Sequence, residues 1–161
     1  MKALIVSDTH GFDKNLFDVL DMVGPIDMLI HAGDVSGSER SIRAGVHCAL
    51  KMVTGNNDYG SPLSSEEEFE FDGYHILLTH GHRDGAYYGS DRLIYKAAER
   101  GANVVIYGHT HLPSIEYDPA LHIWAVNPGS LTLPRQEGRR PSYVIMETDR
   151  FGKVNFDLKY L

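Results

Sequence analysis

The sequence predicts an α/β fold in which a parallel sheet is combined with a second sheet. Apolar runs rich in β-branched residues end abruptly in polar residues, which is typical of buried strands. In the N-terminal part these runs alternate with helical patterns, and this order predicts a parallel sheet with right-handed crossovers. Further along, a hairpin pattern and several short apolar runs predict the second sheet.

The N-terminal elements alternate between strand and helix. Residues 13–24 carry apolar side chains at helical spacing, and Gly24 followed by Pro25 ends the pattern. A weaker helical pattern covers residues 38–49. The strands that flank these two helices are expected at residues 2–8, 27–34 and 50–58.

The C-terminal elements begin with a hairpin. Residues 67–82 read as two strands around the turn Asp72-Gly73. A third helix is expected at residues 90–100, because apolar residues recur at helical spacing and Gly101 follows. Further strands are expected at residues 102–111, 122–127 and 142–147.

The composition is that of one ordinary globular domain, which we expect to cover residues 1–161. Hydrophobic residues make up 42% and charged residues 23% of the chain. The formal net charge of -7 argues against a general affinity for nucleic acid or anionic membranes. The first apolar run is too short for a signal peptide, and no run approaches the length of a membrane span. We therefore expect a cytoplasmic protein without a membrane partner.

Polar residues with metal-binding side chains follow one predicted strand after another. The carboxyl ends of strands in an open parallel sheet are where ligands bind. Each residue alone has a simpler explanation, such as a helix cap, a turn or a buried histidine. Chance accounts poorly for the whole set at successive strand ends. The set consists of Asp8, His10, Asp34, Asn56, Asn57, Asp58, His80, His82, His109 and His111.

The side-chain types in this set indicate a catalytic metal site. Imidazole, carboxylate and amide groups without a thiolate suit Mn²⁺, Fe, Co²⁺, Ni²⁺ or Zn²⁺ at an open site better than a structural zinc cage. The candidates are too many for a single ion that keeps open positions. They suit two ions that share a carboxylate, about 3.5–4 Å apart. Such a pair outweighs the charge of two aspartates and would attract an anion, for which phosphate is the natural choice.

The same residues carry a family resemblance. Together the motifs resemble the calcineurin-like metallophosphoesterase superfamily, and the likeness runs from residue 3 to about residue 135. The segment NPGS at residues 127–130 is similar to the small bacterial and archaeal phosphodiesterase branch of that superfamily. The other motifs are DTH (residues 8–10), GD (33–34), GNND (55–58), HGH (80–82) and GHTH (108–111).

The resemblance implies a four-layer αββα sandwich of two mixed β-sheets flanked by helices, with a dinuclear site at one edge. It implies two divalent metal ions, and we expect Mn²⁺, with Fe, Ni, Co or Zn as alternatives. It assigns Asp34 as the bridge between them. The first ion would be bound by Asp8, His10 and His111, and the second by Asn56, His80 and His109.

The implied reaction is hydrolysis of a small phosphate ester, most specifically a phosphodiester, by attack of a metal-bridging hydroxide. The candidate catalytic residues are Asn57, Asp58 and His82. Many superfamily members have a histidine after the ligand asparagine as the acid for the leaving group, and here Asn57 cannot donate a proton as an acid. We therefore expect a steep dependence on the leaving group. Asp58 and His82 would contact the substrate or support the metal ligands, or have a structural or solvated role.

Two other functions remain open at this point. One is a protein-binding scaffold on the same fold that has lost catalysis, and the other is a nuclease, which the acidic balance disfavours. The sequence predicts no oligomeric state. Arg135, Arg139 and Arg140 lie in a polar loop that we expect to be solvated, with contact to substrate or a partner subunit as the alternative.

Overall fold

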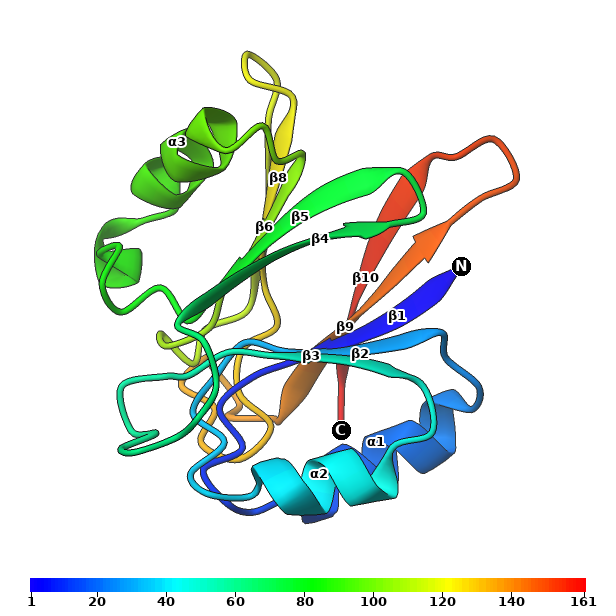
Figure 1. Ribbon diagram of the computed structural model, residues 1–161, viewed down its shortest axis with the longest axis vertical. Helices are drawn as coiled ribbons and strands as arrows, with labels where there is room; N and C mark the ends of the chain where they lie inside the picture. Colours follow the sequence, from blue (N-terminus) through cyan, green and yellow to red (C-terminus); the bar gives the residue numbers. More distant parts are fainter.

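Two five-stranded sheets pack face to face, and helices cover their outer faces (Figure 1). This arrangement is seen in a computed structural model that describes residues 1–161. Both sheets are mixed, since each combines parallel and antiparallel neighbours. The predicted αββα sandwich is therefore confirmed.

The first sheet contains the parallel strands that the N-terminal sequence predicts. Its central strands run parallel, and two C-terminal strands extend one edge in antiparallel fashion. The helices α1 (Lys14–Val23) and α2 (Glu39–Gly45) pack on its outer face. The strand order is β10 (Val154–Tyr160), β9 (Ser142–Thr148), β1 (Lys2–Val6), β2 (Met28–His31) and β3 (Ala49–Met52).

The second sheet is built from the predicted hairpin and the strands after it. Helix α3 (Asp91–Glu99) covers its outer face, and a short 3₁₀ helix, η1 (Ala86–Tyr88), precedes that helix. The hairpin strands and the last pair are antiparallel, and the others are parallel. The strand order is β4 (Glu66–Phe71), β5 (Tyr74–Thr79), β6 (Val104–Ile106), β8 (Ile123–Asn127) and β7 (Ser114–Asp118).

Apolar side chains fill three layers, and this explains the continuous apolar runs of the central strands. In β1, Ile5 faces the layer between the sheets, whereas Leu4 faces the helices. In β5 of the second sheet, Leu78 faces the layer between the sheets, whereas Leu77 faces α3. A strand that is covered on both faces must be apolar at every position.

One predicted element is wrong at its end. The helix expected at residues 38–49 stops at Gly45, and Val46 is extended with φ -111° and ψ 132°. Residue Ala49 already belongs to β3. A Cβ at Gly45 would lie 2.5 Å from the Phe17 ring, so glycine permits α1 and α2 to approach closely at this point. Beyond Gly45 the pairing of β3 with β2 determines the structure, although the sequence continues a weak helical pattern.

The carboxyl ends of β1, β2, β3, β5 and β6 point to one side of the molecule. The loops that follow them converge at the left of Figure 1, between the two sheets. This is the arrangement that a binding site at the carboxyl ends of parallel strands requires. None of the helices has the length and apolar character needed to cross a membrane.

Candidate metal centre

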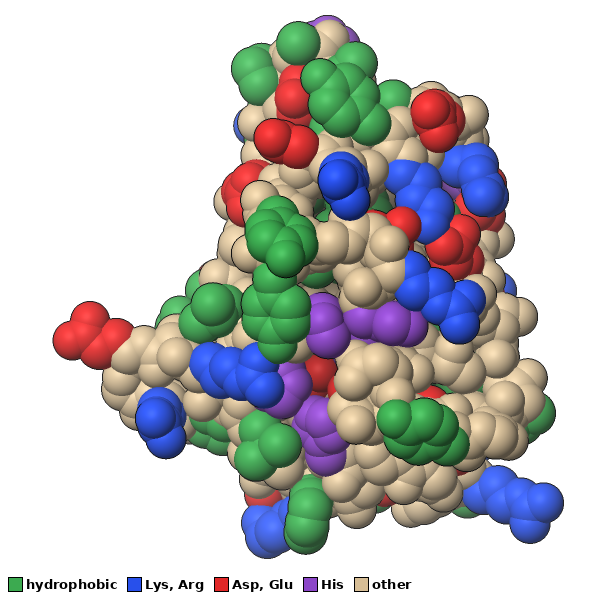
Figure 2. Space-filling view, turned by 90° about the vertical axis from the view of Figure 1, so that its left-hand side faces the viewer, with side chains coloured by type: hydrophobic (Ala, Val, Ile, Leu, Met, Phe, Trp, Pro, Cys, Tyr) green, Lys and Arg blue, Asp and Glu red, His purple; other side chains and the backbone are tan.

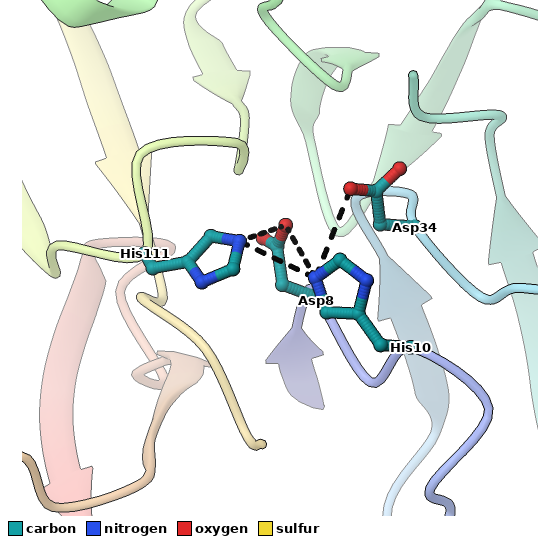
Figure 3. A group of neighbouring side chains, drawn as sticks. All are labelled: Asp8, His10, Asp34 and His111. Atoms are coloured by element: carbon teal, nitrogen blue, oxygen red, sulfur yellow. Dashed lines mark hydrogen bonds and ion pairs between the residues drawn. The ribbon is translucent and has the colours of Figure 1, made fainter. Parts of the chain in front are cut away.

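Four of the predicted ligands form one compact cluster. Asp8, His10, Asp34 and His111 each offer a ligand atom, and these atoms lie within 4.8 Å of one another. Figure 3 shows the four side chains pointing toward one another from three loops, with Asp8 and His10 in the same loop after β1. Oδ1 of Asp8 lies 3.1 Å from Nε2 of His111, and Nε2 of His10 lies 3.3 Å from the same nitrogen. Both carboxylates are buried.

The remaining predicted ligands, Asn56, His80 and His109, adjoin this cluster. Nε2 of His80 lies 3.2 Å from Oδ1 of Asn56 and 3.5 Å from Oδ2 of Asp34. The same Asp34 oxygen lies 3.8 Å from Nε2 of His10. The ring of His109 lies 5.2 Å from the ring of His80. Asp34 therefore stands between two groups of possible ligands.

Backbone strain is concentrated at these residues. A non-glycine residue in the left-handed region costs on the order of 1–3 kcal/mol and persists only where the surroundings enforce it. The turns after the strands use this conformation to aim ligand side chains back over the sheet edges. The predicted ligands with positive φ are Asp8 (56°), His10 (48°), Asp34 (56°), His109 (70°) and His111 (60°).

Backbone carbonyls orient two of the imidazoles. Nδ1 of His80 lies 2.6 Å from the carbonyl oxygen of Ala32, and Nδ1 of His111 lies 2.6 Å from that of Leu133. Each Nδ1–H donates to its carbonyl, so Nε2 is the atom that faces the cluster. This is the usual arrangement of a metal-binding histidine, whose other nitrogen is held by a hydrogen bond.

One oxygen of Asp8 faces the histidines of the cluster without a hydrogen bond of good geometry. Its Oδ2 accepts hydrogen bonds from the hydroxyl of Ser7 at 2.6 Å and from the backbone N–H of His109 at 3.1 Å. Its Oδ1 is buried and accepts no hydrogen bond of good geometry, although Nε2 of His111 lies 3.1 Å away. A buried anionic oxygen in this state is costly unless a positive charge lies beside it. The donor set therefore fits a divalent cation.

Positive charge beside the two carboxylates favours their ionised form. Burial raises the pKa of Asp34, but the hydrogen bond and charge of His80 and the bonds from Asn57 outweigh it, so the net pKa is lowered. Burial also opposes ionisation of Asp8, and His111 and His80 bring its pKa below the ordinary value. Burial and the charge of His80 lower the pKa of His109 to about 4, which keeps that imidazole neutral.

The candidate catalytic residues Asn57 and Asp58 bind the loops that carry the ligands. The backbone N–H of Asn57 donates to Oδ1 of Asp34 at 2.8 Å, and its Nδ2 donates to Oδ2 at 2.7 Å. The Asp58 carboxylate accepts from the backbone N–H groups of Ser36 at 2.6 Å and Gly55 at 2.7 Å. Both side chains thus fix the turn after β3 to the turn after β2.

His82 borders a polar cavity beside the ligands. Its ring lies 5.4 Å from that of His80, and its Nδ1 is buried without a partner. A larger hollow of about 610 Å³ lies at the opposite strand ends, around Met1 and Lys2, away from every predicted ligand. The cavity beside His82 measures about 480 Å³ and is lined by Thr54, Gly55, Asn56, Asp58, Tyr59, Ser61, Leu63, Ser65, His82 and Arg83.

The NPGS segment has a structural role that the sequence did not reveal. Nδ2 of Asn127 donates to the carbonyl of Gly108 and to the hydroxyl oxygen of Thr110, both at 3.0 Å. The hydroxyl of Ser130 donates to the carbonyl of Asp8 at 2.9 Å. These bonds tie the turn after β6 to the end of β1. The sequence shows the NPGS motif, but it does not indicate that Asn127 and Ser130 support the ligand loops.

His31 supports the site from the core of the first sheet. Its Nδ1 accepts a hydrogen bond from the backbone N–H of Gly33 at 3.2 Å, and its Nε2 lies 3.1 Å from the hydroxyl oxygen of Thr9. Burial lowers the pKa of His31 to about 4, so the imidazole is neutral and Nε2–H donates to Thr9. His31 lies within a strand, and no spacing in the sequence signals this contact.

Comparisons with known proteins agree with this site. Residues 1–150 match the model of the calcineurin-like phosphoesterase superfamily domain. The chain is 35% identical over 150 residues to the probable metallophosphoesterase YsnB of Bacillus subtilis. The alignment covers 91% of this chain and 83% of that protein. The chain is also 36% identical over 74 residues to the phosphodiesterase YfcE of Escherichia coli K12, covering 46% of this chain and 35% of that protein.

The fold is shared with a solved structure. A conserved protein from Streptococcus pneumoniae TIGR4, described as a predicted phosphoesterase, superposes with a TM-score of 0.80 at 27% sequence identity. The match covers 99% of this chain and 97% of the other. From the family match and the similarity to YsnB it follows that this chain belongs to the calcineurin-like phosphoesterase superfamily.

Proposed function

We propose that this chain, as one domain over residues 1–161, is a metal-dependent phosphodiesterase with a dinuclear site, for which Mn²⁺ is the expected metal. The observation that carries the proposal is the position of Asp34. One carboxylate oxygen, Oδ2, lies 3.5 Å from Nε2 of His80 and 3.8 Å from Nε2 of His10. It thus faces an imidazole from each ligand group, as a bridging ligand would. One ion is assigned to Asp8, His10 and His111, and the other to Asn56, His80 and His109.

The protein's own residues orient these groups. When bound, divalent ions at such a site activate water as a nucleophile and neutralise charge on the phosphoryl group. Asn57 holds both oxygens of Asp34, and Asp58 fixes the turn from which Asn56 and Asn57 project. His82 borders the adjoining cavity, which has room for one ester group of a substrate.

Two arguments favour a small phosphodiester as the substrate. The relative YfcE is named a phosphodiesterase, although the alignment with it covers only part of either chain. The net charge of -7 disfavours long nucleic acid, because association with a polyanion requires a basic surface. The expected substrate is therefore a small phosphate diester with a leaving group that departs readily.

The test uses the intact protein before and after treatment with EDTA. We expect the protein to hydrolyse bis(p-nitrophenyl) phosphate faster than p-nitrophenyl phosphate, to lose activity with its metals, and to regain it with Mn²⁺. Elemental analysis should give two metal ions per chain when activity is restored. Full activity without metal would contradict the proposal. Two bound ions without turnover of any ester would identify a binding scaffold, and cleavage of DNA or RNA in preference to small diesters would identify a nuclease.

A further inference from the structure

The backbone of Arg135 is hydrogen-bonded to His111, a predicted metal ligand. Its N–H donates to the carbonyl oxygen of His111 at 3.1 Å. Two residues earlier, the carbonyl of Leu133 accepts the hydrogen bond from Nδ1 of His111. The loop that ends at Arg135 therefore follows His111 closely, and the position of this arginine is set together with that of the ligand.

The guanidinium of Arg135 contacts Tyr87, which lies in η1 beside the second sheet. It donates a hydrogen bond to the Tyr87 phenol oxygen. The Tyr87 hydroxyl in turn lies 3.4 Å from the carbonyl oxygen of His109, to which it donates. The Tyr87 ring meets the His109 ring edge-on, with 4.6 Å between the ring centres. The guanidinium is thus linked to His109 through Tyr87, and the Arg135 backbone is linked to His111.

Arg135 has no carboxylate partner. Some basic groups of the chain have such partners, as Lys96 has in Asp84 and Arg100 in Glu68, so their charge is already neutralised. Figure 2 shows basic side chains on two sides of the exposed histidines on this face. The planar guanidinium matches the geometry of phosphate oxygens and remains charged at any relevant pH. An unpaired arginine fixed at this place in an acidic protein is suited to a phosphate anion.

We propose that Arg135, positioned by Tyr87, binds a non-bridging oxygen of the substrate phosphate. This inference rests on the proposed function, since it assigns a substrate contact at the same site. Other arginines of the loop differ from Arg135. The Arg139 side chain makes no hydrogen bond or ion pair, and Arg140 donates to the carbonyl of Leu161 at 3.1 Å. Arg135 alone among them contacts the residues around the predicted ligands.

The experiment measures binding of inorganic phosphate to the Mn²⁺-loaded full chain by calorimetry, with metal content determined for each variant. We expect Arg135→Gln to weaken phosphate binding by about tenfold or more, because a hydrogen bond to a charged group is lost. Arg135→Lys should restore part of the affinity. Arg139→Gln is the matched control and should bind phosphate as the unmodified protein does.

Tyr87 is tested as a positioning residue. Tyr87→Phe should weaken phosphate binding less than Arg135→Gln does, and it should add no further loss in the Arg135→Gln background. Additive losses would show that Tyr87 acts independently of Arg135 and would overturn its assigned role.

Three outcomes would overturn the inference: no phosphate binding by the unmodified protein, unchanged binding by Arg135→Gln, or loss of metal from that variant. Hydrolysis of bis(p-nitrophenyl) phosphate by the same preparations separates the two proposals. Arg135-dependent phosphate binding without hydrolysis would refute the proposed function and leave the anion site standing. Hydrolysis with an unchanged KM and unchanged phosphate affinity in Arg135→Gln would refute the inference alone.

Discussion

At the scale of single residues, Asn57 has a contact that accounts for its presence. It stands where many superfamily members have a histidine, and it binds both oxygens of Asp34. Its backbone N–H would survive substitution, whereas its Nδ2 would not. The side chain therefore contributes to the orientation of the residue between the two ligand groups, and a proton-transfer role is not needed to explain it.

Asn57→Ala should lower the affinity for metal by about 10–100-fold, the usual effect of removing a group that orients a metal ligand. The measurement is competition for Mn²⁺ with a chelator of known affinity. Asn155→Ala, at an exposed position of β10, is the matched control and should leave affinity unchanged. Unchanged affinity in Asn57→Ala would show that the backbone N–H alone fixes Asp34.

His31 should make the stability of the metal-free protein depend on pH. Its folded pKa of about 4 lies below the unfolded value of about 6.5, so the unfolded chain binds more protons between these values. The stability that neutral His31 confers is present above about pH 6.5 and is lost as the pH falls toward 4. Between pH 7 and pH 5 this amounts to about 2 kcal/mol.

The test compares the unmodified protein with His31→Asn by urea unfolding in EDTA. The difference in free energy of unfolding between the two proteins should shrink by about 2 kcal/mol from pH 7 to pH 5. Comparing the two proteins cancels the contributions of the other histidines. A difference that stays constant over this range would mean that His31 keeps an ordinary pKa in the folded state.

At the scale of elements, the turns after β2 and β3 interlock through glycine. A Cβ at Gly55 would lie 2.0 Å from Oδ1 of Asp34 and 2.5 Å from its backbone nitrogen. A Cβ at Gly33 would lie 2.7 Å from Nδ1 of His80. These contacts explain why GD and GNND both contain glycine, since no larger residue permits so close an approach.

Gly55→Ala should destabilise the protein by more than about 2 kcal/mol and reduce its metal content, because the added carbon displaces Asp34. Gly60→Ala is the control from the neighbouring loop. At Gly60 no atom lies within 4 Å of the added carbon, and only the backbone strain at φ +72° is expected, on the order of 1 kcal/mol. Urea unfolding and metal analysis measure both effects. Equal losses in the two variants would contradict the steric argument.

At the scale of the whole molecule, the site depends on the packing of the two sheets. Loops of the first sheet supply Asp8, His10, Asp34 and Asn56, and loops of the second supply His80, His109 and His111. The apolar layer between the sheets, which includes Ile30, Leu78 and Ile106, therefore sets the distance between the two groups of ligands.

Leu78→Ala should lower the free energy of unfolding by about 2–5 kcal/mol, since it opens a cavity between the sheets two residues before His80. Leu121→Ala, at a position that is 38% exposed, should cost less than about 1 kcal/mol. Urea unfolding in EDTA measures the apolar contribution without the metals. A small effect of Leu78→Ala would mean that this layer collapses around the missing side chain.

The sequence by itself determined the order of the helices and of every strand except β7 and β10, together with the residue types at the strand ends. Both follow from short-range physics: apolar periodicity reports burial, and polar residues after a buried strand must lie at a sheet edge. The end of the helix at Gly45 was missed because the pairing of β3, a contact with β2, overrides the local pattern.

Only the tertiary structure decided which side chains meet. His10 and His111 are 101 residues apart, yet their Nε2 atoms lie 3.3 Å from each other. Asn57 binds Asp34, and Arg135 joins Tyr87, through contacts between loops of separate strands. Such contacts depend on how the sheets dock and on left-handed turns that aim each side chain, and neither leaves a periodic signal in the chain.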